Sequence, residues 1–162
     1  MQTSPPTLLG EARIAELMHA YLAAEYRWEL DGRWLDLRLG APTPGLWTRF
    51  PDAACAGLLS AWDPCSIPRP ESTNREADRR LHRDLIETGL PFRAAFSSAT
   101  NRTWREPSWL VLGMSPSAFD ALSRRYGQLA TLYWTPDAPI RLRVDAARPA
   151  NVADDARIVW LR

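Results

Sequence analysis

Polar side chains gather where an apolar stretch of the sequence runs into a proline-rich loop. Residues 54 to 62 are nearly all apolar, and the loop after them leads into a long charged segment. Pro64, Pro68 and Pro70 remove three backbone donors and stiffen the loop, so its polar groups should be held in one arrangement. We therefore expect a binding site at this junction.

A second polar segment, Glu106-Pro107-Ser108, leads into another apolar run. If the strands beside the two segments belong to one sheet, both segments can border the same cavity. The predicted ligand-binding residues combine one aromatic ring with carboxylates, hydroxyls, amides and a guanidinium: Trp62, Asp63, Ser66, Asn74, Arg75, Glu106, Ser108 and Gln128. An anionic small molecule or a nucleotide is the expected ligand, because a helix start beside the loop presents free N–H groups and the positive end of its dipole.

That helix start is predicted from a capping box, Thr73 with Glu76, or from Ser72 one position earlier. A plainer interpretation needs no ligand. In that interpretation Asp63 binds loop amides and the capping side chains fill the helix start, since polar loop residues commonly bind their own backbone.

Two other functions fit the sequence. In an enzyme, Asp63 or Glu106 acts as general base, or the two carboxylates hold Mg²⁺ together with substrate phosphates. A third possibility is a surface for a protein partner around Trp104, which stands among arginines in the segment from Ser97 to Glu106; we favour a nucleic-acid partner less. We favour non-catalytic binding and expect no metal and no cofactor, because the sequence holds no complete catalytic triad, metal-ligand cluster or phosphate-binding glycine loop.

Composition narrows the class of protein. A chain of 162 residues is the size of one domain, and its formal net charge of +1 removes bulk charge as an argument for nucleic acid or a membrane surface. All 20 basic residues are arginine, which excludes Schiff-base lysine chemistry and a Walker-type lysine. We expect a cytoplasmic protein, because we find no signal-peptide pattern and no apolar run of membrane-spanning length.

Hydrophobic periodicity predicts an α/β (α+β) fold. We expect a flexible leader over residues 1–10 and a single domain over 11–162. The domain should hold a mixed sheet of about five to seven strands, an N-terminal hairpin and three main helices packed on the sheet. The two longest helices are expected at about 11–25 and 72–88, and a third should open at Ser115-Pro116.

The hairpin is predicted in most detail, because Asp31-Gly32 is a favoured two-residue turn. A two-residue turn sets the register of the flanking strands. It pairs Trp28 with Leu35 and Tyr26 with Leu37 on the core face, and Arg27 with Asp36 and Glu29 with Trp34 on the other face.

Several short motifs together resemble a bacterial family known only as domain of unknown function 3293. They occur in order over about residues 21–134, which leaves 145–162 as a C-terminal extension. The motifs are Tyr26-Arg27, Leu37-Arg38-Leu39-Gly40, Ser60-Ala61-Trp62-Asp63-Pro64-Cys65-Ser66, Glu71, Asn74-Arg75 with Leu81, Glu106-Pro107-Ser108-Trp109-Leu110-Val111-Leu112-Gly113, and Tyr126-Gly127-Gln128. The resemblance implies a compact bacterial α/β domain of the cytosol and names no reaction.

Overall fold

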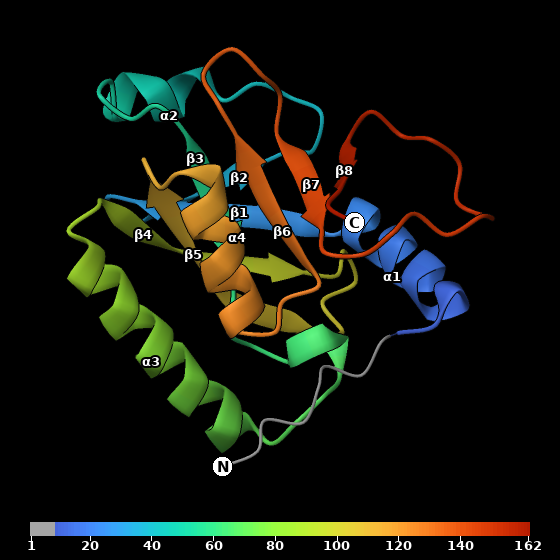
Figure 1. The fold of residues 1–162 in the computed structure, drawn as a ribbon. Helices are drawn as coiled ribbons and strands as arrows, with labels where there is room; N and C mark the ends of the chain where they lie inside the picture. Colours follow the sequence, from blue (N-terminus) through green and yellow to red (C-terminus); the bar gives the residue numbers. More distant parts are fainter. Residues whose placement is uncertain (1–8) are drawn as a thin grey trace.

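The computed structural model describes residues 9–162, which form a curved sheet with helices on both sides (Figure 1). The expected leader falls largely on residues 1–8, outside the described part of the chain. In chain order the elements are α1 (Glu11–Ala23), β1 (Glu25–Leu30), β2 (Arg33–Leu37), α2 (Pro44–Arg49), β3 (Ala56–Leu59), a 3-10 turn (Pro64–Ser66), α3 (Glu71–Thr88), β4 (Phe92–Ser98), β5 (Arg105–Leu112), α4 (Pro116–Arg125), β6 (Ala130–Trp134), β7 (Arg141–Val144) and β8 (Ile158–Trp160).

The strands form a single sheet in the order β2-β1-β4-β5-β3-β6-β7-β8. Every neighbouring pair is antiparallel except β7 with β8, which is parallel. The predicted mixed α/β sheet is thus confirmed. The expected five to seven strands are too few, because the hairpin and the short β8 both join the same sheet, which has eight strands. None of the helices within residues 9–162 is long and apolar enough to cross a membrane.

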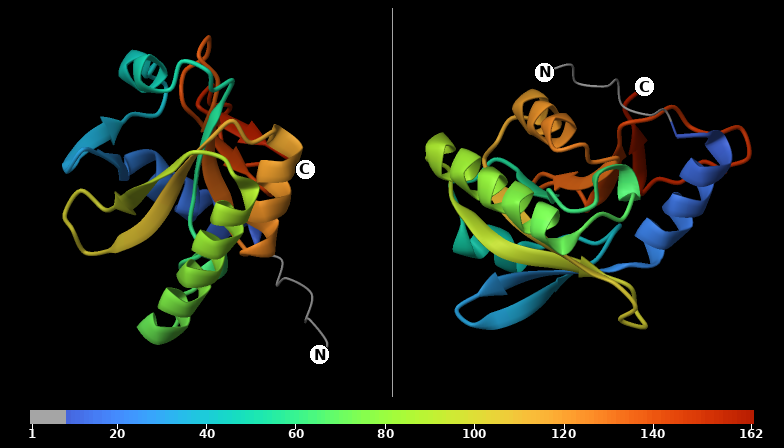
Figure 2. Two further views of the ribbon diagram at one scale, coloured as in Figure 1. Left: turned by 90° about the vertical axis from the view of Figure 1, so that its left-hand side faces the viewer. Right: turned by 90° about the horizontal axis from the view of Figure 1, so that it is seen from below.

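Alternating side chains divide the core between the two faces of the sheet. Leu58 and Leu132 pack in one cluster with residues of α1 and α2. Leu59 and Val111 are each next to a residue of that first cluster in their strand, so they point to the other face, where they pack with α3 and α4. Figure 2 shows α3 and α4 together, apart from α1. The central strand β3 is therefore buried on both faces, as its unbroken apolar sequence predicts.

The predicted register of the hairpin is confirmed at all four pairs. Arg27 and Asp36 form an ion pair across it, with Nε and Oδ1 3.0 Å apart. Leu35, however, was expected on the core face and is 38% exposed. The reason is that β2 is an edge strand, so its middle residues extend past the helices that cover the rest of the sheet.

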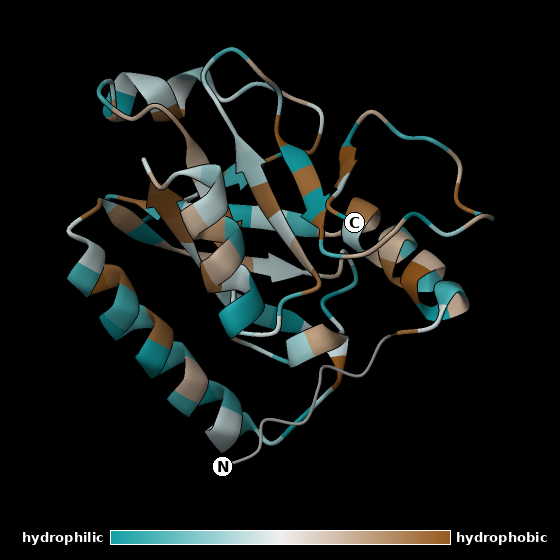
Figure 3. Ribbon diagram, in the orientation of Figure 1, coloured by the Kyte–Doolittle hydropathy of each residue, from teal (hydrophilic) through white to brown (hydrophobic). Residues whose placement is uncertain are grey.

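The start of α3 differs from the predicted capping box. The helix begins at Glu71 with Pro70 as its N-cap, and no side chain caps it. The carbonyl of Pro70 accepts from the amides of Thr73 and Asn74, and the Glu76 carboxylate binds Arg80 one turn later. Apolar residues follow the sheet-facing side of α3 in Figure 3 and charged residues the other side. Ile86, in the last turn of the helix, is 56% exposed.

Close contact between β3 and α4 depends on a glycine. A Cβ placed on Gly57 would lie 2.3 Å from a ring carbon of Phe119, closer than any real contact. Phe119 is fully buried and packs on Tyr133, with ring centroids 5.2 Å apart. Only a residue without a side chain at position 57 lets α4 lie this close to the sheet.

We expect Gly57→Ala to destabilise the fold by about 1–3 kcal/mol, because the added methyl group forces the buried Phe119 ring to move. Urea denaturation measures the loss. Gly45→Ala in α2 is the matched control, since a Cβ there meets no atom within 4 Å. A Gly57→Ala variant as stable as the Gly45→Ala control would show that the ring can move without cost.

Candidate functional site

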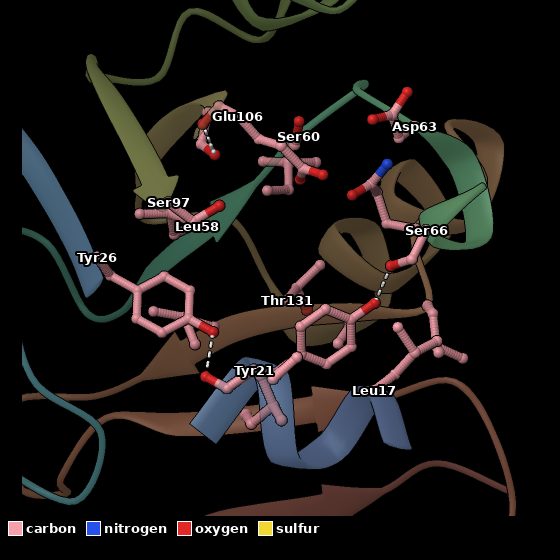
Figure 4. Close-up of a pocket in the computed structure, with 18 of the residues that line it drawn as sticks. Leu17, Tyr21, Tyr26, Leu58, Ser60, Asp63, Ser66, Ser97, Glu106 and Thr131 are labelled. Carbon is pink, nitrogen blue, oxygen red and sulfur yellow. Dashed lines mark hydrogen bonds between the residues drawn. The ribbon is translucent and has the colours of Figure 1, made fainter. Parts of the chain in front are cut away.

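A cavity of about 330 Å³ lies between α1 and one end of the sheet (Figure 4). Its apolar side is formed by leucines of the α1-facing core, among them Leu17, Leu58 and Leu132. Its polar side comes from the loop after β3 and from the facing strands β4 and β5. The cavity therefore joins a hydrophobic surface to a group of oxygen-bearing side chains.

The two polar segments singled out in the sequence do border one cavity. Asp63 and Ser66 line it from the loop after β3, and Glu106 and Ser108 line it from β5. Gln128, just before β6, lines it as well and donates from Nε2 to the carbonyl of Trp62, 3.1 Å away. This convergence arises because β3 is antiparallel to both β5 and β6, which brings the end of β3 next to the start of each.

Three residues directly opposite one another on adjacent strands form the polar wall. Tyr26 of β1 pairs with Ser97 of β4, which pairs with Glu106 of β5. The Tyr26 hydroxyl donates to the carbonyl of Tyr21 at 2.6 Å. Ser97 is only 8% exposed, and within residues 9–162 neither its hydroxyl nor the Glu106 carboxylate has a hydrogen-bond partner. Two polar groups thus face the cavity unused.

The cavity changes how its acids and phenols titrate. Burial, with a smaller effect from the negative charge of Asp63, raises the pKa of Glu106 to about 7. Burial also raises the pKa of Tyr21 to about 12, although a hydrogen bond to the Ser66 hydroxyl opposes the change. Glu106 consequently changes its charge near neutral pH, whereas Tyr21 stays neutral there.

The loop after β3 is held by a network centred on Asn74, which is 2% exposed. The Asn74 amide donates to Asp63 Oδ1 at 2.7 Å, and its oxygen accepts from the Asp63 amide at 2.9 Å and from Arg69 Nε at 2.5 Å. Arg69 also donates to the carbonyl of Ala61 at 2.7 Å. This network fixes a backbone with unusual torsions, since φ is positive at Asp63, Cys65 and Ser66.

Hydrogen bonds to this network and to other neighbours engage all the backbone donors of the loop. Every amide N–H from residue 62 to 69 has a partner. Trp62 donates to Ser60 Oγ, Asp63 to Asn74, Cys65 to Gly127, Ser66 to Asp63, Ile67 to Pro64 and Arg69 to Asp63, while Pro64 and Pro68 have no N–H. The loop therefore offers no free amide to an anion.

Three of the eight predicted site residues do not line the cavity. Arg75 lies on the exposed face of α3, where its Nε donates to Glu71 Oε1 at 2.8 Å. The Asn74 side chain is bound within the loop network, and the carbonyl of Trp62 accepts the hydrogen bond from Gln128. Arg75 was expected to point at the loop, but α3 begins earlier than predicted, and Asn74 takes the inward position instead.

Sequence reasoning missed the part of the wall that comes from α1 and the neighbouring strands. Tyr21, Tyr26 and Ser97 line the cavity, and so does Trp104, which was assigned to an exposed loop. Tyr26 was placed on the core face of the hairpin with no role in the site, and Tyr21 belongs to the apolar face of the first helix. A tyrosine on such a face was the available signal, because a buried hydroxyl requires a polar neighbour. No group of three or more His, Cys, Asp and Glu side chains in residues 9–162 is arranged to hold a metal ion.

We expect Asn74→Ala to destabilise the chain by about 2–4 kcal/mol, because it leaves the buried partners of Asn74 without hydrogen bonds. Arg75→Ala, the adjacent position, should cost less than about 0.5 kcal/mol, since its ion pair is exposed. Urea denaturation of both variants tests this contrast. If Asn74→Ala lowers the free energy of unfolding no more than Arg75→Ala does, the network does not stabilise the loop.

We expect Glu106 to make stability depend on pH. Its pKa rises from 4.5 to about 7 on folding, so the folded chain holds this proton more tightly than the unfolded chain. The resulting stabilisation is complete below the unfolded pKa and is lost as the pH rises through the folded pKa. Relative to Glu106→Gln, the parent should lose up to about 3 kcal/mol between about pH 4.5 and pH 7. Urea denaturation of both proteins over this pH range measures the loss. A difference in the free energy of unfolding that stays constant between the two proteins would contradict the raised pKa of Glu106.

Comparison with known proteins identifies one region of the chain. No curated protein and no solved structure matches this chain. One family model does match, described as "Protein of unknown function (DUF3293)", and it covers residues 59–131. The matched segment runs from the end of β3 to the start of β6 and holds Asp63, Glu106 and Gln128 of the cavity. The match confirms the resemblance seen in the motifs, since residues 59–131 of this chain match the model of the DUF3293 family.

Proposed function

We propose that this chain binds a small organic molecule in the cavity between α1 and the sheet. The observation that carries the proposal is the pairing of an apolar floor with unused polar groups. Leu58 and Leu132 give the ligand apolar contact, while Glu106 and Ser97 are available for hydrogen bonds. A volume of about 330 Å³ is in the range of small-molecule sites.

The loop from 62 to 70 acts in this proposal as a rigid wall. The anionic ligand or nucleotide expected from the sequence has weak support, because the loop amides and Arg75 are engaged elsewhere. Arg13 also lines the cavity, but its guanidinium is paired with Glu16 at 2.7 Å. The cavity therefore lacks the free positive groups that bind phosphates or carboxylates.

A catalytic role is the second candidate, and one observation favours it. A carboxyl group with a pKa of about 7 is suited to accept or donate a proton near neutral pH, and Glu106 is such a group at a cavity. Asp63 suits the role less, because its Oδ1 is bound by Asn74 and by the Arg69 amide. A protein-partner surface at Trp104 has less support, since that side chain is half-buried and lines the cavity.

We expect a bulky side chain at the cavity mouth to block binding without disturbing the core. Ala20 is an exposed residue of α1 that lines the cavity, and Ala23 is an exposed alanine of the same helix that does not. In a thermal-shift screen of small organic molecules, some compounds should raise the melting temperature of the parent. The same compounds should leave the melting temperature of Ala20→Phe unchanged and raise that of Ala23→Phe.

The contrast between the two variants is decisive, because both add the same ring to the same helix. If both respond to a compound as the parent does, that compound binds elsewhere. If no compound stabilises the parent, the proposed binding function fails.

A further inference from the structure

We propose that the ligand of this cavity is an organic cation, a small amine whose ammonium group is held by the carboxylate of Glu106. The inference rests on the proposed binding function and names the class of ligand. Around the cavity some hydrogen-bonding groups are engaged with one another, and others have no partner.

Most donors that line the cavity are already spent. Ser60 donates from Oγ to the carbonyl of Pro107 at 2.8 Å, and Ser108 donates to the carbonyl of Glu106 at 3.4 Å. The Gln128 amide donates to the carbonyls of Trp62 and Tyr126. The lining donors left without a partner within residues 9–162 are neutral, namely the hydroxyls of Ser97 and Thr131 and the indole N–H of Trp104, so no free positive group remains for an anion.

Acceptors, in contrast, are left over. Within the described part of the chain, both oxygens of the Glu106 carboxylate and Oδ2 of Asp63 have no hydrogen-bond partner. The Ser97 hydroxyl, more than nine-tenths buried, lies beside Glu106 on the neighbouring strand and is also unpartnered (Figure 4). A ligand that donates hydrogen bonds would satisfy these groups, and an ammonium group supplies up to three donors.

The charges that line the cavity also favour a positively charged ligand. The charged lining residues are Arg13, Glu16, Asp63 and Glu106. Since Arg13 and Glu16 neutralise each other, the two remaining acids give the cavity an excess of negative charge when they are ionised. A positive ligand is attracted by this excess and restores the charged form of Glu106, whereas an anion is repelled.

Aromatic rings complete the surroundings of a cation. Tyr21, Tyr26 and Trp104 line the cavity. The hydroxyls of both tyrosines are engaged, Tyr21 with Ser66 and Tyr26 with the carbonyl of Tyr21. The tyrosines therefore offer ring surface to a ligand, and rings beside a carboxylate are a common environment for bound ammonium groups.

Binding of an amine should depend on pH, because it requires ionised Glu106. The groups around Glu106 that carry charge or can titrate are Asp63 from the loop, Tyr26 from β1, and Arg13, Glu16 and Tyr21 from α1. Burial raises the pKa of both tyrosines far above neutral. Affinity for an amine should therefore rise as the pH passes through about 7, the pKa of free Glu106.

The test uses three probes of one shape and different charge: benzylamine, benzyl alcohol and benzoate. Each is titrated at millimolar concentration into the full-length ¹⁵N-labelled chain, and the backbone amides of Ser97 and Glu106 and the indole N–H of Trp104 are followed by NMR. We expect benzylamine to shift these signals at the lowest concentration and to bind more tightly at higher pH.

Glu106→Gln keeps the shape of the side chain and removes its charge. It should weaken benzylamine by about ten- to a hundredfold, abolish the pH dependence and leave benzyl alcohol nearly unchanged. Glu76→Gln, which alters an exposed acid of α3, is the matched control and should bind all probes as the parent does. Dispersed spectra of both variants verify that they are folded.

The outcomes separate this inference from the binding function itself. If benzyl alcohol or benzoate binds at the cavity as tightly as benzylamine, or if Glu106→Gln leaves benzylamine binding intact, the cavity binds ligands but the cation assignment is wrong. If none of the probes shifts the cavity signals, both the inference and the proposed function are overturned.

Discussion

The hydrogen bonds of Asn74 determine the shape of the site. A buried amide that binds Asp63 and Arg69 at the same time joins the start of α3 to both ends of the loop after β3. These hydrogen bonds help to offset the cost of three non-glycine residues with positive φ. The stiff prolines and this one side chain together turn a surface loop into a cavity wall.

The loop is also fastened from the opposite side. Gly127 has φ of +66°, and a Cβ there would lie 2.8 Å from Pro64. The Cys65 amide donates to the Gly127 carbonyl at 2.8 Å, and Gln128 reaches the carbonyl of Trp62. The segment after α4 and the loop after β3 are thus interlocked, and both lie within the DUF3293 match. α1 and β1 close the cavity from outside that match, so the site needs both parts of the chain.

Errors in the sequence-based expectations have definite physical causes. A capping box was inferred at Thr73, but the Pro70 carbonyl starts the helix earlier, and Asn74 is drawn inward by Asp63. Arg75 then points to solvent, which removes the positive charge on which an anion site depended. Leu35 is exposed because β2 is an edge strand, and the local sequence pattern does not show which strands lie at an edge.

Local chemistry in the sequence determined elements such as the hairpin, whose register is set by Asp31-Gly32, and the buried strand β3. The convergence of Asp63 with Glu106 requires in addition that β3 lies antiparallel to β5 in one sheet. Tertiary structure decided which polar groups are free. Whether a carboxylate is spent on an amide, as in Asp63, or left facing a cavity, as in Glu106, depends on neighbours far away in the chain. Burial and partner geometry set the charge of the site, and neither can be read from residue types alone.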